Sequence, residues 1–115
     1  MLLHDIMTVM HDFGVADARF LPYWSNRHLI GLSSREALVS AYLRADGRGL
    51  LLIAGAQVDG PMELEVTLQG ELAALQGAAA RNALSGKPLS WRDGRLVWPL
   101  PGRAVQLAIV ERGGQ

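Results

Sequence analysis

The stretch from Leu38 to Ala56, LVSAYLRADGRGLLLIAGA, constrains the fold more than any other part of the 115-residue chain. Apolar and polar residues alternate from Val39 to Arg44, which is the period of a strand with one buried face. Asp46-Gly47 predicts a hairpin turn, because glycine readily adopts positive φ. The unbroken apolar run from Leu50 to Ala54 predicts a strand that is covered on both faces. We expect this hairpin to lie at the centre of an antiparallel β structure.

The rest of the chain predicts more short strands and little helix. Residues 62–69 alternate cleanly between apolar and polar, and residues 89–98 form a second hairpin around Asp93-Gly94. Residues 70–77 are rich in helix formers but too short for a stable helix, so they predict a single helical turn. Residues 105–109 supply a last strand. This pattern indicates an all-β chain, an antiparallel β-sandwich of about seven strands with a short N-terminal helix.

The N-terminal helix carries an apolar stripe that is broad for so small a protein. Its members recur at helical spacing and are Leu3, Ile6, Met10 and Phe13, with Gly14 where a helix usually ends. Contiguous apolar surface is seldom left exposed on a monomer. We therefore expect this stripe to form an interface with another domain or with a second copy of the chain.

The composition of the chain limits the classes of partner that it is expected to bind. Eleven basic and eleven acidic residues balance, and the arginines are scattered, which argues against a nucleic acid or an anionic membrane as partner. No stretch approaches the ~20 apolar residues of a membrane-spanning helix. The chain has no cysteine, which excludes disulfides and thiolate chemistry but leaves the cellular compartment open. A chain of this length can fold without a metal or a cofactor, and we expect neither.

Three patterns that suggest catalysis are weak. His4-Asp5 and His11-Asp12 share a helix face, but a separation of seven residues places the two histidines about 10 Å apart, too far for one metal ion. Residues 81–88 end like a phosphate-binding loop, yet the first glycine is missing and Pro88 replaces the magnesium-binding hydroxyl. The acidic residues lie in turns or on a wet strand face, and they suggest no glycosidase pair. A small hydrolase using the helix is the least supported function.

Aromatic residues give a further possibility. Tyr23 and Trp24 follow Pro22 and lie off the alternating strands, so they could stack on sugar rings, although packing in the core is the plainer alternative. Trp91 and Trp98 are better explained by the core.

Several segments together resemble the C-terminal β-sandwich of bacterial glycoside-hydrolase-like proteins, particularly those akin to glycoside hydrolase family 123, in which a TIM barrel comes first. The segments are FLPYWSN at 20–26, residues 38–56, the strand at 62–69 and residues 83–110. The family plan is matched at Tyr42-x-Arg44, Leu50 to Ala54, Leu72 to Leu75, Asn82 to Gly86 and Leu100-Pro101. Gly55 and Asn82 depart from it, since Asn and Asp are usual at those places.

The resemblance implies a division of the chain and a role. Residues 1–26 would be the tail of a preceding domain with its crossing segment, and residues 27–115 the β-sandwich. The catalytic carboxylates would lie in the barrel, so no functional residue carries over to this chain. It would be a non-catalytic accessory module that braces the barrel or a second copy of itself. The alternative is a stand-alone carbohydrate-binding sandwich that uses Tyr23 and Trp24.

Overall fold

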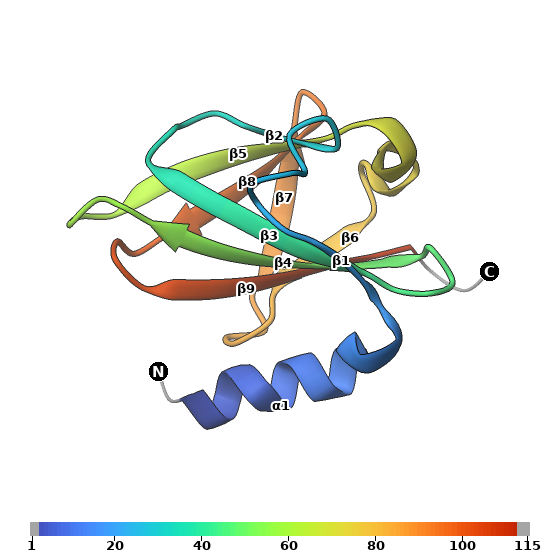
Figure 1. The fold of residues 1–115 in the computed structure, drawn as a ribbon. Coiled ribbons are helices and arrows are strands. Elements are labelled where there is room, and N and C mark those ends of the chain that lie inside the picture. The colour runs from blue at the N-terminus through green and yellow to red at the C-terminus, as the bar shows by residue number, and fades with distance from the viewer. Residues whose placement is uncertain (1–2, 113–115) are drawn as a thin grey trace.

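The computed structural model describes residues 3–112, with side chains from Asp5 onward. These residues form one α-helix, two short 3-10 helices and nine strands (Figure 1). In chain order the elements are α1 Leu3–Phe13, η1 Val15–Asp17, β1 Arg19–Leu21, β2 Ile30–Leu32, β3 Ala37–Leu43, β4 Gly49–Ala56, β5 Met62–Leu68, η2 Gly70–Leu75, β6 Ala79–Asn82, β7 Pro88–Arg92, β8 Arg95–Leu100 and β9 Val105–Glu111. The predicted all-β class with a short N-terminal helix is confirmed.

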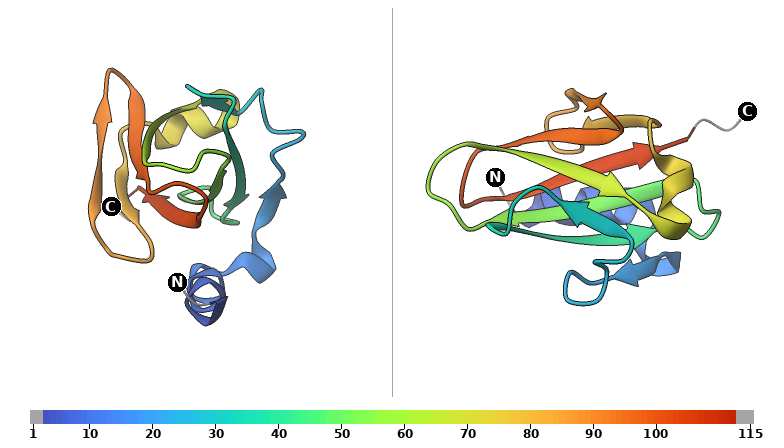
Figure 2. Two further views of the ribbon diagram at one scale, coloured as in Figure 1. Left: turned by 90° about the vertical axis from the view of Figure 1, so that its left-hand side faces the viewer. Right: turned by 90° about the horizontal axis from the view of Figure 1, so that it is seen from above.

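The strands form one continuous antiparallel sheet in the order β1-β3-β4-β9-β6-β7-β8-β5-β2. The sheet curls around its own core as an open half-barrel (Figure 2). The predicted sandwich of about seven strands is therefore wrong in both the number of strands and the number of sheets. Two of the additional strands are β1 and β2, of three residues each, which lie at the two ends of the sheet.

Strand β7 is the reason that the sheet is continuous. Its first residues, Pro88 and Leu89, pair with β6, whereas Ser90 to Arg92 pair with β8. One strand thus joins what would otherwise be the two layers of a sandwich. The predicted turn at Asp93-Gly94 is confirmed, with φ of 53° and 78°, and it sets Trp91 opposite Leu96.

The concave side of the sheet holds the main hydrophobic core. Leu50, Leu64, Leu96 and Trp98 are fully buried there. The segment Gly70–Leu75 is the predicted single helical piece, and it directs Leu72 and Leu75 into the same core. Burial of several large side chains at once is the main force that holds the curled sheet together.

The convex side of the sheet is covered by α1, which lies outside the curl (Figures 1 and 2). Phe13 is only 4% exposed and packs with Leu51, Leu107 and Ile109 of β4 and β9. Leu50 and Leu52 point into the concave core while Leu51 faces the helix, so β4 is covered on both faces as predicted. Of the apolar stripe, Ile6, Met10 and Phe13 are thus packed against the chain's own sheet.

Arg44 fastens the end of α1 to the sheet. Its guanidinium lies 4.4 Å from the centroid of the Phe13 ring, and its Nε donates to the Phe13 carbonyl oxygen over 3.4 Å. The same guanidinium is 2.9 Å from Glu111, which also pairs with Arg81 at 2.9 Å. Gly14 then ends the helix with φ of 92°, the left-handed conformation that glycine adopts without strain.

Within residues 3–112, no helix is long and apolar enough to cross a membrane.

Candidate functional site

Four aromatic side chains meet on the surface where β1 pairs with β3. Trp24 is 67% exposed, Phe20 45% and Tyr23 41%, whereas Tyr42 is partly buried. The Phe20 ring lies 4.9 Å from the ring of Tyr42, its partner in the β1–β3 register. Tyr23 and Trp24 meet edge to face at 5.0 Å, and Phe20 and Trp24 at 6.4 Å. We call Phe20, Tyr23, Trp24 and Tyr42 the aromatic cluster.

For Tyr23 and Trp24 the sequence left two alternatives open, exposed rings or packing in the core, and the structure brings these two side chains together on the surface. It adds Phe20, which sequence reasoning missed. The signal for Phe20 depends on the register of β1 against β3, which brings it opposite Tyr42. Exposed aromatic rings of this kind offer a large apolar area with polar edges, which suits a partly polar ligand.

The loop that carries the aromatic cluster is held by Asn26, the one buried polar side chain in the described part of the chain, at 4% exposure. Its amide donates to the carbonyl oxygens of Leu21 at 3.0 Å and Val39 at 2.9 Å. Its own main-chain carbonyl accepts from Leu29 and Ile30. Asn26 therefore links β1, β3 and β2, and it fixes the loop before any ligand binds.

A cavity of about 270 Å³ lies beside this loop, between β2 and the beginning of β3. Its lining is mixed, with apolar side chains and with polar and charged groups at Tyr23, Asn26, Arg27, Ser34 and Arg35. Tyr23 belongs both to this lining and to the aromatic cluster. The cavity occupies the opening of the half-barrel, where the two ends of the sheet approach each other without pairing.

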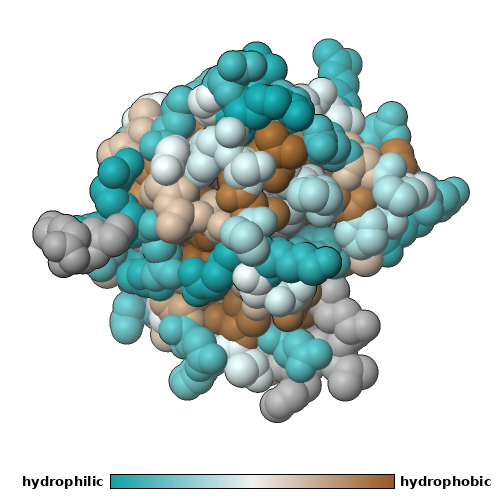
Figure 3. All heavy atoms as spheres, turned by 180° about the vertical axis from the view of Figure 1, so that it is seen from behind, coloured by the Kyte–Doolittle hydropathy of each residue, from teal (hydrophilic) through white to brown (hydrophobic). Residues whose placement is uncertain are grey.

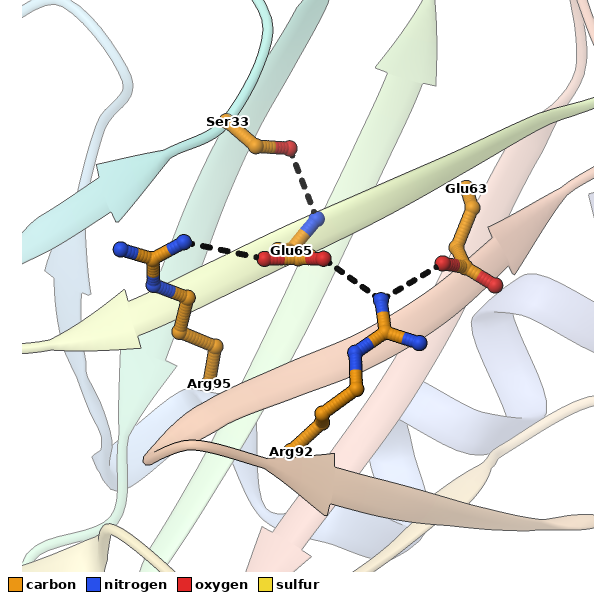
Figure 4. A network of polar contacts seen from close by, with 5 residues as sticks. All are labelled: Ser33, Glu63, Glu65, Arg92 and Arg95. Atoms are coloured by element: carbon orange, nitrogen blue, oxygen red, sulfur yellow. Dashed lines mark hydrogen bonds and ion pairs between the residues drawn. The ribbon is translucent and has the colours of Figure 1, made fainter.

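A second group of polar side chains lies on the outer surface of β5, β7 and β8 (Figure 4). Arg92 contacts Glu63 at 2.9 Å and Glu65 at 2.6 Å, and Arg95 contacts Glu65 at 3.2 Å. Ser33 Oγ accepts from the main-chain N–H of Glu65. Hydrogen bonds from Arg92 and Arg95 hold the pKa of the Glu65 carboxyl below its ordinary value.

This network ties strands together, because its carboxylates and guanidinium groups come from three neighbouring strands. A general acid in a glycosidase needs the opposite environment, one that raises the pKa of a carboxyl. The predicted position of Glu63 and Glu65 on the wet face of a strand is confirmed, since both side chains reach solvent.

The other residues singled out from the sequence lie on α1. Asp5, His11 and Asp12 are exposed, while the side chains of Leu3 and His4 lie outside the described part of the structure. No three potential metal ligands gather among the residues that the structure describes. Ile6, Met10 and Phe13 pack against the outer face of the sheet, so a partner could meet only what these side chains leave uncovered. Apolar side chains do gather between the helix and the body, as the rear view shows (Figure 3).

Comparison with known proteins gives a likeness in fold. No protein-family model and no curated protein matches the sequence. An alpha-amylase from Anoxybacillus, described as giving insight into a new glycosyl hydrolase subclass, superposes with a TM-score of 0.64 at 11% identity over 96% of this chain. AmyP in complex with maltose gives 0.53 at 12% identity over 71% of this chain, and an AmyP variant in complex with maltotriose gives 0.55 at 14% over 70%.

This chain spans only 22% of the Anoxybacillus chain and 15% to 16% of AmyP. The fold is therefore that of one part of much larger proteins. The resemblance to glycoside hydrolases is supported at this coarse level, and nothing in the likeness favours family 123 in particular. At these identities the likeness concerns the fold, and the fold alone does not assign an activity.

Proposed function

We propose that this chain is a non-catalytic accessory domain of a glycoside-hydrolase-like protein and that it packs beside a catalytic barrel. The observation that carries the proposal is the Anoxybacillus likeness, which extends over 96% of this chain but only 22% of the amylase. A domain of this size in such a protein has its own core and contacts its neighbour over a limited surface.

The outer surface of β5 adds support. Two arginines favour the ionised form of Glu65, and its carboxylate therefore forms ion pairs that link β5 to β7 and β8. A proton donor for glycosidic cleavage would need a carboxyl that stays protonated near neutral pH. The described surface carboxylates with the most contacts, Glu65 and Glu111, are both shifted the other way.

The accessory role is tested by making the chain alone and together with the protein encoded next to it. We expect the purified chain to leave starch and aryl glycosides unchanged, and the adjoining coding sequence to specify a barrel that co-purifies with this domain. The barrel made without the domain should unfold at a lower temperature. Hydrolysis that follows the chain through successive purification steps would contradict the proposal.

A second candidate function is carbohydrate binding by the aromatic cluster. The specific observation that favours it is the exposure of Trp24 and Tyr23, which meet edge to face on a loop fixed by Asn26. Rigid, exposed aromatic rings can contact a sugar face without first being ordered, which lowers the entropic cost of binding.

This candidate is tested by titrating maltotriose and a panel of other oligosaccharides into ¹⁵N-labelled protein. We expect chemical-shift changes around residues 20–24 that disappear in Trp24→Ala. Met7→Ala is the matched control, because Met7 is 60% exposed on α1 and is not part of the cluster. A panel that shifts no resonance of the loop would exclude this function.

A further inference from the structure

The cavity at the opening of the half-barrel has the enclosure, the lining and the volume of a binding site for a small ligand. Four segments enclose it: the loop between β1 and β2, strand β2, the loop between β2 and β3, and the beginning of β3. Its inner wall is apolar, with Ile30 and Val39 buried beneath it. Its volume of about 270 Å³ lies just under the range of about 300 to 1,000 Å³ that is usual for drug-sized ligands, so it suits a single small ring.

Two arginines, Arg27 and Arg35, line this cavity, and neither makes an ion pair with any residue between 3 and 112. Most other arginines are engaged. Six of them pair with carboxylates and one with main-chain carbonyls: Arg19, Arg44, Arg81, Arg92, Arg95, Arg103 and Arg112.

The cavity therefore carries uncompensated positive charge. None of the described residues that line it is acidic, and the nearest carboxylate in sequence, Glu36, is exposed and outside the lining. Two free guanidinium groups at one opening attract an anion, and the planar donor fork of arginine matches a carboxylate in particular.

Tyr23 adds a second element of recognition. Its ring is 41% exposed, lines the cavity and continues into the aromatic cluster. A simple inorganic anion would use the arginines and leave the apolar wall and the Tyr23 ring without a partner. A ligand that joins a carboxylate to a ring with an apolar face would use all of them.

We propose that this cavity binds an acidic sugar, a uronate residue, with its carboxylate at Arg27 and Arg35 and its ring against Tyr23. The inference rests on the second candidate function and specifies its ligand. Ser34, which also lines the cavity, supplies a hydroxyl group for the sugar hydroxyls.

The test is an NMR titration of ¹⁵N-labelled protein with methyl glucuronide, methyl glucoside and acetate. We expect the uronide to shift the amides of Tyr23, Gly31 and Leu38, which line the cavity, and to bind more tightly than the other two. Arg27→Gln and Arg35→Gln should each weaken uronide binding by about tenfold or more, as expected for loss of a charged hydrogen bond.

Arg48→Gln is the matched control. Arg48 is also without an ion pair in the described part, but it lies in the turn after β3, at the other end of that strand from the cavity. The Arg48→Gln variant should bind the uronide as the wild type does. Melting temperatures should be unchanged in all three variants, because these arginines are exposed and their side chains make no ion pair in the described part of the chain.

The outcomes separate this inference from the function on which it rests. If acetate binds as tightly as the uronide, or if both arginine variants bind as the wild type does, the inference is overturned. If neutral oligosaccharides shift the Trp24 loop while the uronide does not bind at the cavity, the second candidate function survives and the inference fails. If no sugar of either kind binds, both fail.

Discussion

The side-chain amide of Asn26 donates a 2.9 Å hydrogen bond to the main-chain carbonyl oxygen of Val39, and so joins the loop after β1 to β3. A second bond of 3.0 Å reaches Leu21. Both acceptors would lose their donor in Asn26→Asp, which keeps the shape of the side chain. Because leaving a buried polar group unsatisfied costs about 1 to 3 kcal/mol, we expect a loss of at least about 2 kcal/mol in the free energy of unfolding.

Urea denaturation monitored by tryptophan fluorescence measures this loss. The matched control is Asn82→Asp, because an aspartate keeps the two bonds that the Asn82 Oδ1 accepts from Leu84 and Ser85 and loses only the partly buried bond from Nδ2 to Gln106 Oε1. We expect the control to lose less than about 1 kcal/mol. Equal losses in the two variants would show that the Asn26 bonds do not hold the loop.

Gly49→Ala should weaken the attachment of α1 to the sheet indirectly, through Arg44. A Cβ at Gly49 would lie 2.6 Å from Nη1 of Arg44, so the guanidinium must leave its place over Phe13. We expect a loss of about 1 kcal/mol, the value of a cation–π contact at a partly exposed site, and faster amide exchange at the end of α1.

Gly55→Ala is the control in the same strand, since a Cβ there meets nothing within 4 Å and should be tolerated. A double-mutant cycle adds a sharper check. In an Arg44→Ala background, Gly49→Ala should cost almost nothing, because the group that it displaces is already gone. Additive losses would contradict the proposed link.

The ion pairs of Glu111 predict a dependence of stability on pH. Hydrogen bonds from Arg44 and then Arg81 lower the pKa of the Glu111 carboxyl in the folded state. A lowered folded pKa means that ionisation stabilises the fold above the ordinary glutamate value of about 4.3, and that this contribution is lost as the pH falls through the folded value. Glu111→Gln should therefore cost about 0.5 to 1 kcal/mol at pH 7 and progressively less in acid.

Denaturation curves recorded between neutral and acidic pH provide the measurement. Glu36→Gln serves as control, because the Glu36 side chain makes no ion pair with any residue in the described range. A difference between wild type and Glu111→Gln that stays constant with pH would mean that the charge of Glu111 is not what stabilises the fold.

Phe13→Ala distinguishes a helix that belongs to this domain from one that waits for a partner. Phe13 is 4% exposed against Leu51 and Leu107, so its truncation should cost about 3 to 5 kcal/mol. Met7→Ala, on the exposed side of the same helix, should change stability by less than about 0.5 kcal/mol. If Phe13→Ala left stability unchanged but altered the sedimentation of the protein, the stripe would serve an interface between chains.

Local patterns predicted the parts of the fold that depend on neighbouring residues. The β3–β4 hairpin, the alternation of β5 and the turn at Asp93-Gly94 are each determined by side-chain period and glycine chemistry, and all three are confirmed. The number of sheets was not predictable in this way. It depends on β7 pairing with β6 at one end and with β8 at the other, and on three-residue strands that only distant partners define.

The candidate site, too, was predictable only in part. Pro22 separates Tyr23 and Trp24 from the alternating strands, so the sequence allowed exposed rings at these positions, although it favoured packing in the core. The role of Arg27 and Arg35 could not be predicted, because the sequence of a polar loop does not show whether its charged side chains form ion pairs in the fold. The partner of the helical stripe was also hidden, although the doubly covered run in β4 required some element on the outer face of the sheet.

The sheet ends in two strands, β1 and β2, of three residues each. Free sheet edges invite pairing with other molecules and so promote aggregation and fibre formation, and natural proteins guard against this with very short edge strands. The segment with the strongest tendency to stack, the leucine-rich β4, lies inside the sheet between β3 and β9. This arrangement keeps the most aggregation-prone strand, β4, from pairing with other copies of the chain. Only the two short edge strands remain for another strand to pair with.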